Sequence, residues 1–329
     1  MKQRCSLSFV LLLLLSSAAI SQTKRENTSS VFKIVGYYFL HTAISDTIHA
    51  DADYRFLDKI THLNLAFMNP DSTGQFRDKL AIDTLVKKAH RKGVKVLASI
   101  AGGGPHPYYA KLLQDEHRSL FVRNLMSMVK QYHLDGIDVD IEGSDIDTNY
   151  GRFVTELAAT LHPQKKLLSA AIATAYRDQL PDKALQQFDY VTIMSYDRTG
   201  PWSPGRPGHH APYQMAVDDL HYWNYIRAIP KEKLVLGVPF YGYGFGAVNA
   251  PVVSMDYKTI HSLYPNEYAS DTLLLPEHIT MYYNSAATIQ KKTLLAKQKA
   301  SGIMIWQLLG DAAGDASLLK AIYDVVYHE

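Results

Sequence analysis

The sequence predicts a single (β/α)₈ (TIM) barrel, in which eight parallel strands alternate with helices. From Val31 onward, short apolar runs alternate with amphipathic stretches, the pattern of a parallel sheet joined by helical crossovers. Eight runs have the length of strands, and eight strands close this kind of barrel. No period of about 20 to 50 residues repeats and no low-complexity linker divides the chain. We therefore expect one domain over residues 31–329.

Each element follows from its own pattern. We expect strands at Phe32–Tyr38, Ile60–Met68, Val94–Ile100, Gly136–Glu142, Leu167–Thr174, Tyr190–Tyr196, Leu234–Phe240 and Ile303–Leu308. We expect helices at Asp83–Arg91, Tyr108–Tyr132, Tyr150–Leu161, Asp182–Phe188, Met215–Ile226, Thr288–Ala300 and Ala316–Tyr327. Phe153, Leu157 and Leu161 illustrate the helical pattern, because a spacing of four residues places them on one buried stripe.

The first 21 residues have the pattern of a secretory signal peptide. Lys2 and Arg4 precede an apolar run, and small residues follow it up to Ser21. A retained membrane anchor is the alternative, but the run is shorter than the roughly 20 residues that a spanning helix needs. We expect export, to an extracellular or periplasmic location, and a polar flexible lead-in over residues 22–30. Cys5 lies within the signal peptide, so the mature protein should contain no cysteine.

The charge of the mature chain is balanced. The sequence has 34 basic and 32 acidic residues, and removal of Lys2 and Arg4 leaves 34 − 2 = 32 basic residues. A neutral protein has no electrostatic reason to bind nucleic acid or an anionic membrane, so we expect neither partner, and we expect a monomer. A chain of about 300 residues buries enough apolar surface to fold without disulfides.

The fourth predicted strand carries a row of acids. Asp138, Asp140 and Glu142 alternate with Ile137, Val139 and Ile141, so one face of the strand is apolar and the other is acidic. Like charges this close cannot all stay ionised, and at least one pKa must rise, which produces a general acid at neutral pH. An exposed strand face and a divalent-metal site are the alternatives. The β-branched residues and the flanking glycines favour a buried strand that ends at a site.

At these residues the sequence resembles a known family. The stretch D-G-I-D-V-D-I-E, Asp135 to Glu142, is similar to the D-G-x-D-x-D-x-E signature of family 18 glycoside hydrolases, the chitinases and endo-β-N-acetylglucosaminidases. The resemblance extends over nearly all of the mature chain. Val96–Gly104 resembles the family's S-x-G-G third strand, with Ala101 in place of the first glycine, and Met194–Asp197 resembles its M-x-Y-D sixth strand.

The resemblance implies a set of site residues at the carboxyl ends of the strands, where (β/α)₈ enzymes place their chemistry. Trp306 would form the floor beneath the reacting sugar, although an aromatic residue in a strand is often plain barrel core. For Tyr196 the alternative is a buried phenol that bonds any nearby acceptor. The implied catalytic residues are Glu142, Asp140, Asp138 and Tyr196, and the implied substrate-binding residues are Trp306, Met194, Asp197, Tyr37, Phe67 and Tyr241.

Many relatives carry an α+β insertion domain after the seventh strand. Only 56 residues, 246–301, separate Phe245 from Gly302, and they include the seventh helix. We therefore expect no large insertion domain and a comparatively open binding site.

The family mechanism is substrate-assisted. By resemblance, Glu142 would protonate the glycosidic oxygen while the 2-acetamido oxygen of the substrate attacks the anomeric carbon. Asp140 would bond the acetamido N–H, and Asp138 would share a proton with Asp140. Tyr196 would donate to the acetamido oxygen. The resemblance implies a retained anomeric configuration, no cofactor and no metal.

Several functions remain open within this class. The implied substrate is a polymer or oligomer of β-1,4-linked N-acetylglucosamine, such as chitin. The chitobiose core of N-glycans and peptidoglycan are alternative substrates, and a carbohydrate-binding protein on an inactive barrel is an alternative of another class.

Two other motifs imitate metal sites. Asp145, Asp147 and Asn149 with Glu156 have the spacing of a calcium loop, but Tyr150 stands where the sharp turn needs glycine. His209-His210 lies in a Pro/Gly-rich loop without a third ligand nearby, so we expect surface histidines there rather than a metal pair.

Overall fold

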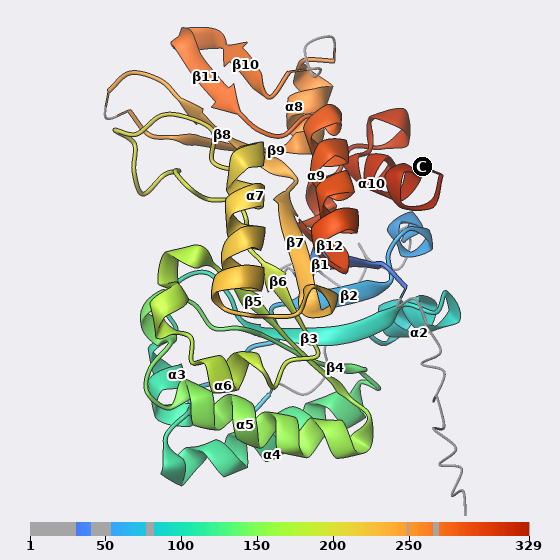
Figure 1. Cartoon of the computed structure of the whole chain (residues 1–329), viewed down its shortest axis with the longest axis vertical. Coiled ribbons are helices and arrows are strands. Elements are labelled where there is room, and N and C mark those ends of the chain that lie inside the picture. Colours follow the sequence, from blue (N-terminus) through green and yellow to red (C-terminus); the bar gives the residue numbers. More distant parts are fainter. Residues whose placement is uncertain (1–30, 41–53, 77–81, 249, 266–269, 329) are drawn as a thin grey trace, which may run out of the picture. The chain divides into compact units, whose positions relative to one another are not determined.

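The computed structural model describes residues 31–40, 54–76, 82–248, 250–265 and 270–328. The predicted signal peptide and lead-in, residues 1–30, lie outside the described residues. Eight parallel strands close into a barrel in the order β1-β12-β7-β6-β5-β4-β3-β2, which confirms the predicted fold class (Figure 1). These strands are β1 (Lys33–Phe39), β2 (His62–Ala66), β3 (Lys95–Ala101), β4 (Gly136–Asp140), β5 (Leu167–Ile172), β6 (Tyr190–Ile193), β7 (Leu234–Pro239) and β12 (Gly302–Trp306).

Helices surround the barrel. They are α2 (Asp83–Arg91), α3 (Pro107–Leu112), α4 (Asp115–Gln131), α5 (Tyr150–Leu161), α6 (Asp182–Leu185), α7 (Tyr213–His221), α9 (Ala286–Lys299) and α10 (Leu318–Tyr327). Short helical turns lie at Arg55–Asp58, Gly143–Asp145, His162–Gln164, Thr174–Gln179, Tyr222–Ile226, Lys231–Lys233, Pro276–His278, Leu308–Gly310 and Gly314–Ala316. The helices α2 and α5 begin and end at the predicted residues.

The predicted helix Tyr108–Tyr132 is wrong as one element, because the structure divides it into α3 and α4. Gln114 adopts an extended conformation, with φ −66° and ψ 155°, and interrupts the helical hydrogen bonds. Asp115 and Glu116 then occupy the first turn of α4, where acidic side chains interact favourably with the helix dipole.

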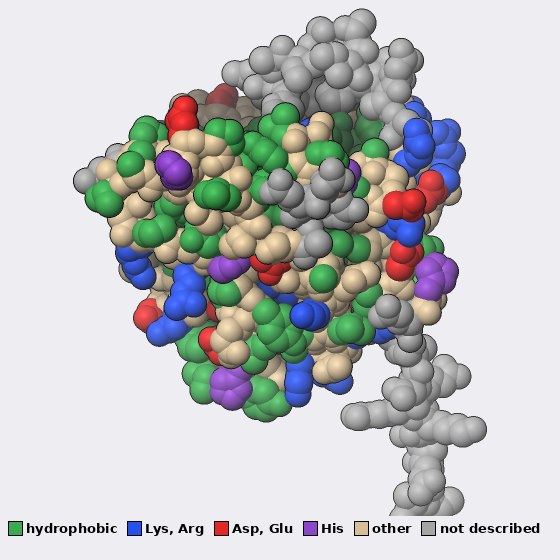
Figure 2. Space-filling view, turned by 90° about the horizontal axis from the view of Figure 1, so that it is seen from above, with side chains coloured by type: hydrophobic (Ala, Val, Ile, Leu, Met, Phe, Trp, Pro, Cys, Tyr) green, Lys and Arg blue, Asp and Glu red, His purple; other side chains and the backbone are tan. Residues whose placement is uncertain are grey.

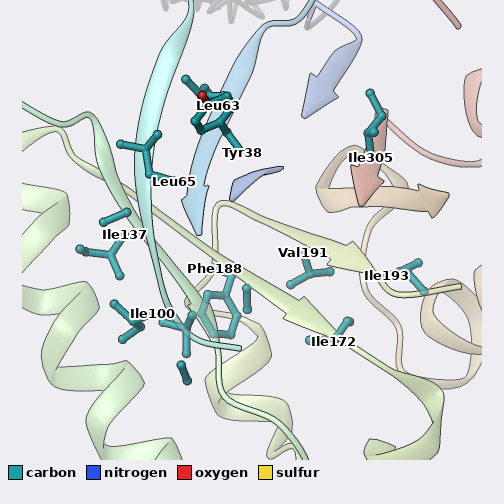
Figure 3. Close-up of a cluster of buried hydrophobic side chains, with 14 of the residues drawn as sticks. Tyr38, Leu63, Leu65, Ile100, Ile137, Ile172, Phe188, Val191, Ile193 and Ile305 are labelled. Carbon is teal, nitrogen blue, oxygen red and sulfur yellow. The ribbon is translucent and has the colours of Figure 1, made fainter. Parts of the chain in front are cut away.

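The main hydrophobic core consists of side chains from the barrel strands and the surrounding helices (Figure 3). Ile137 and Val139 of β4 belong to it together with Leu125 of α4 and Phe153 of α5, and all four are fully buried. Because side chains alternate along a strand, this packing directs the acids of β4 into the barrel.

A small antiparallel sheet interrupts the barrel sequence between β7 and α9. It contains β8 (Tyr241–Phe245), β9 (Val253–Asp256), β10 (Thr272–Leu275) and β11 (Ile279–Tyr282) in the order β10-β11-β8-β9. One helix, α8 (Tyr257–Leu263), lies between β9 and β10 in the sequence (Figure 1). The segment is short, as expected, but its strands were not predicted from the sequence. Each has only four or five residues, too few to show a clear period.

Charges of both signs are mixed on the surface. Figure 2 shows basic and acidic side chains interspersed with hydrophobic and other side chains on the face that it displays. Among the helices of the described ranges, none is long and apolar enough to cross a membrane.

Candidate active site

The acid row of β4 lies inside the barrel. Asp138 is fully buried and accepts hydrogen bonds from the hydroxyls of Tyr37 (2.7 Å), Ser99 (2.8 Å) and Ser169 (2.6 Å). These donors come from β1, β3 and β5, so Asp138 ties three strands together beneath the site. Asp138 therefore anchors the barrel interior.

Asp140 is also buried, and its carboxyl group hydrogen-bonds to that of Glu142. Two carboxylates form such a bond only when one of them carries a proton. Asp140 can therefore share a proton with Glu142. The predicted sharing of a proton between Asp138 and Asp140 stays a prediction. The other oxygen of Asp140, Oδ1, has no hydrogen-bond partner among the residues that the structure describes.

The environment raises the pKa of both carboxyls, so that the pair retains a proton. Burial and, to a smaller extent, the negative charge of Asp197 together raise the pKa of Glu142 to about 7. Burial also raises the pKa of Asp140 well above its ordinary value, helped by the charges of Glu142 and Asp138. The site can therefore hold a proton at neutral pH where a reacting oxygen would reach it.

Tyr196 lies near this pair with an available hydroxyl. The side chain is 7% exposed, and its hydroxyl makes a weak contact with Met304 Sδ at 4.0 Å. A glycine on β7 makes room for the ring, because a Cβ on Gly237 would lie 3.1 Å from Tyr196 Cε1 and 2.3 Å from the Ile193 carbonyl oxygen.

Aromatic rings form one side of the site. The ring of Trp306 lies 5.7 Å from that of Phe67 in a stacked arrangement and 5.4 Å from that of Tyr37. Gly102 permits this packing, because its φ is +95° and an added Cβ would lie 2.3 Å from the Phe67 ring. Trp306 is half-buried and lines a cavity, whereas Tyr37 is fully buried and bonded to Asp138. Of these two rings, only Trp306 can therefore offer a face to a ligand without rearrangement.

Asn69 holds the end of β3, and it belongs to none of the predicted motifs. Ala101 adopts the left-handed conformation, with φ +71°, where the family pattern has glycine. Asn69 holds it there, accepting from Ala101 N (2.6 Å) and donating to Ala101 O (2.9 Å). These bonds offset part of the cost of a side chain at positive φ.

Asp197 is surrounded by three groups from the loop and from β8. Tyr241 donates to Asp197 Oδ1 (2.5 Å), Tyr243 also hydrogen-bonds to this carboxylate, and His210 Nδ1 lies 3.3 Å from Oδ1. The expectation of surface histidines is wrong for His210, which is 1% exposed. The Pro/Gly-rich loop has no periodicity from which its burial could be predicted.

Two cavities meet at Asp197. The larger one has a volume of about 600 Å³, and its lining includes Met194, Tyr196, Arg198 and Trp202. The smaller one has a volume of about 190 Å³, and its lining includes Tyr241, Tyr243, Asp256, Trp306 and Gln307. Trp202 is 60% exposed at the first cavity and was not predicted as a site residue. Of the predicted site residues, Met194, Tyr196, Asp197, Tyr241 and Trp306 line these two adjoining hollows. The acids Asp138, Asp140 and Glu142, and the rings of Tyr37 and Phe67, are not among the lining residues.

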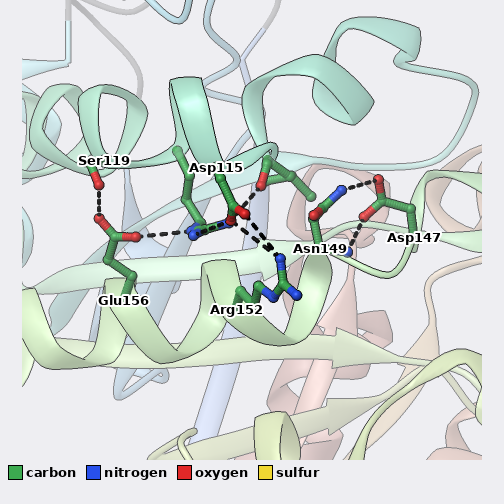
Figure 4. A network of polar contacts seen from close by, with 8 residues as sticks. Asp115, Ser119, Asp147, Asn149, Arg152 and Glu156 are labelled. Carbon is green, nitrogen blue, oxygen red and sulfur yellow. Dashed lines mark hydrogen bonds and ion pairs between the residues drawn. The ribbon is translucent and has the colours of Figure 1, made fainter.

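The carboxylates with the spacing of a calcium loop form hydrogen bonds with other residues of the protein. Glu156 accepts from Ser119 Oγ (2.5 Å) and Arg118 Nε (2.9 Å) on α4, whereas Asp147 accepts from the backbone of Asn149 (Figure 4). These carboxylates are engaged with separate partners. Within the described ranges, no three His, Cys, Asp or Glu side chains gather where they could hold a metal ion.

An eight-stranded barrel with a buried acid row at the carboxyl ends of its strands defines the class of (β/α)₈ glycosidases. The model of the glycosyl hydrolases family 18 matches residues 33–311. The chain belongs to this family.

Solved structures agree with this assignment. The GH18 chitinase ChiB from the chitin utilization locus of Flavobacterium johnsoniae is 34% identical, with a TM-score of 0.81, covering 91% of this chain and 94% of that one. A chitinase from Bacteroides thetaiotaomicron is 27% identical, with a TM-score of 0.77, covering 91% of this chain and 98% of that one.

A curated relative, the chitinase-like effector of Moniliophthora roreri, is 31% identical over 224 residues, which cover 57% of this chain and 53% of the relative. The chain also spans less than two thirds of the length of other curated relatives that it matches, 61% in the case of Probable chitinase 2 of Drosophila melanogaster.

Proposed function

We propose that this protein is a secreted hydrolase of β-1,4-linked N-acetylglucosamine polymers, such as chitin and chitooligosaccharides. One observation carries the proposal above the others. Glu142, with a pKa raised to about 7, is bonded to Asp140, whose second buried oxygen is unpartnered in the described structure. A proton donor beside a free acceptor is what a substrate-assisted reaction on an acetamido sugar needs. The chitinase names of similar structures support the same substrate class.

In the first step, Glu142 gives its proton to the glycosidic oxygen. The acetamido oxygen of the sugar attacks the anomeric carbon as the glycosidic C–O bond breaks, forming a cyclic oxazolinium ion. The free oxygen of Asp140 accepts the acetamido N–H, which orients the group, and its negative charge stabilises the developing cation. Tyr196 donates its hydroxyl to the acetamido oxygen and limits its rotation.

In the second step, Glu142 acts as a base. It removes a proton from water while the water oxygen attacks the anomeric carbon and the oxazolinium ring opens. Two displacements at one carbon retain its configuration. Every proton in this cycle passes through Glu142, and the proposed steps use no metal or cofactor. The export of the protein and its action as a monomer are parts of this proposal.

A carbohydrate-binding function without turnover is the second candidate. A relative named as a chitinase-like effector favours it, whereas the intact Asp140–Glu142 pair favours catalysis. Product analysis separates the candidates, using chitotetraose, a high-mannose glycoprotein and purified peptidoglycan as substrates. The proposal predicts shorter N-acetylglucosamine oligomers from chitotetraose. Release of N-glycans alone would show that the substrate is the chitobiose core of N-glycans, and release of cell-wall fragments alone would show that it is peptidoglycan. Binding without any product would favour the second candidate.

The pH dependence of turnover follows from the pKa of Glu142. Because the acid must be protonated, kcat/KM on chitotetraose should fall as the pH rises through about 7. Asp197→Asn removes a negative charge that favours the protonated acid, so this basic limb should move to lower pH. A pH–rate profile of both proteins measures the effect, and a limb that stays in place in Asp197→Asn would contradict the role assigned to Asp197.

A further inference from the structure

We propose that His210 is a positioning residue that holds Asp197 toward the acid Glu142, and that a buried clamp formed by Lys292 and Asn284 holds His210 in place. The inference rests on the proposed function, because Asp197 matters here through its effect on the proton of Glu142. It assigns a role to a loop histidine and to a buried lysine that the reaction steps themselves do not use.

The ring of His210 is confined. Its centroid lies 5.0 Å from that of Tyr241 and 4.9 Å from that of Tyr243, and only 1% of the residue is exposed. These two tyrosines also bond Asp197. The histidine and the carboxylate are therefore packed against the same pair of rings.

The ring of His210 faces the carboxylate of Asp197. Nδ1 lies 3.3 Å from Asp197 Oδ1, and neither ring nitrogen has a well-aligned hydrogen bond within the described part of the chain. Buried polar groups are nearly always hydrogen-bonded, so a small rotation that lets Nδ1–H donate to Asp197 satisfies this nitrogen. Asp197 is 38% exposed, and without this neighbour its carboxylate is held by the hydroxyls of Tyr241 and Tyr243 alone.

The clamp acts on the residue after His210. Lys292 Nζ donates to the carbonyl oxygen of Ala211 (2.8 Å) and to Asn284 Oδ1 (2.8 Å), and Asn284 Nδ2 donates to the same carbonyl (3.0 Å). Lys292 is fully buried, and burial lowers its pKa to about 7. Burying a lysine is costly, and here its donors fix the end of the loop that carries His210.

A backbone hydrogen bond from Arg198 also holds His210. Its carbonyl oxygen accepts from the N–H of Arg198, the residue after Asp197, at 2.9 Å. The two ends of the loop are thus joined beside the site. The titratable and charged groups near His210 are Asp197, His209, Tyr241, Tyr243 and Lys292.

The test compares His210→Phe, which keeps a ring between the tyrosines but has no N–H, with His210→Asn, which keeps a donor. We expect His210→Phe to lower kcat on chitotetraose by about 10-fold or more, with KM changed by less than about threefold, because the interaction acts on the acid rather than on binding. The basic limb of its pH profile should move to lower pH as Asp197 turns away from Glu142. His210→Asn should recover part of both effects.

The clamp is tested with Asn284→Ala, which keeps the bond from Lys292 to the loop. It should change kcat and the basic limb in the same direction as His210→Phe, by a smaller amount. Unfolding temperatures are measured for all variants, and if His210→Phe does not fold, His210→Met takes its place in the comparison.

A uniform loss of activity in His210→Phe with an unmoved pH profile, or a basic limb that moves to higher pH, would overturn the inference. So would equal damage in His210→Phe and His210→Asn. A failure of the proposed function can be distinguished from a failure of this inference. In that case the wild type itself would give no product from chitotetraose, or Glu142→Gln would have the same turnover as the wild type.

Discussion

Glu142→Gln should lower kcat on chitotetraose by about 10²–10⁴-fold. The amide has nearly the shape of the protonated carboxyl but cannot give a proton to the leaving oxygen or accept one from water. Because the amide keeps the size and shape of the side chain, the variant should fold and bind oligosaccharides with an affinity close to that of the wild type. Steady-state kinetics and calorimetric binding measure the two quantities separately.

Glu116→Gln is the matched control, because Glu116 is exposed on α4 and the same amide replaces the same acid. It should leave kcat and KM unchanged. If Glu142→Gln kept the kcat of the wild type, or if both variants lost activity equally, Glu142 would not be the acid.

Substrates that lack the 2-acetamido group should not be cleaved. The attacking oxygen belongs to the sugar and is held next to the anomeric carbon, and an intramolecular group of this kind contributes an effective concentration of about 10⁵–10⁸ M. Cellotetraose has the same linkage without this oxygen, so its rate of hydrolysis should be lower than that of chitotetraose by about 10⁵-fold or more. Chromatography of the products from both tetrasaccharides makes the comparison.

Weak binding could lower the rate on cellotetraose for another reason. The control is therefore an excess of cellotetraose at which saturation of Glu142→Gln is verified by calorimetry. Appreciable hydrolysis under saturation would show that a group of the protein can serve as the nucleophile, and the acetamido mechanism would then be wrong.

Much of the fold could be predicted because its signals are local and periodic. The strand β4 has strict alternation, and its apolar residues pack outward while Asp138 and Asp140 lie inside the barrel. The helix α5 follows a spacing of four residues from end to end. Where the period is long enough to repeat, the face that is buried can be derived from the sequence.

The remaining features depend on contacts between distant residues. Strands of four residues, such as β9, are stabilised by pairing with β8, which the sequence around them does not indicate. His210 is buried because β8 and the clamp from α9 cover its loop. The buried carboxylate of Asp138 accepts from three hydroxyls on other strands. None of these contacts leaves a local pattern.

The central claim is that the acetamido group of the substrate, rather than Asp140, attacks the anomeric carbon. The most direct measurement is mass spectrometry of the intact protein after incubation with a mechanism-based fluorosugar, combined with the binding of a thiazoline analogue of the oxazolinium ion. The claim predicts no covalent adduct and strong thiazoline binding, which Asp140→Ala should weaken through loss of a charge-assisted hydrogen bond of about 1.5–3 kcal/mol. A glycosyl adduct on Asp140, with thiazoline binding unaffected by Asp140→Ala, would contradict it.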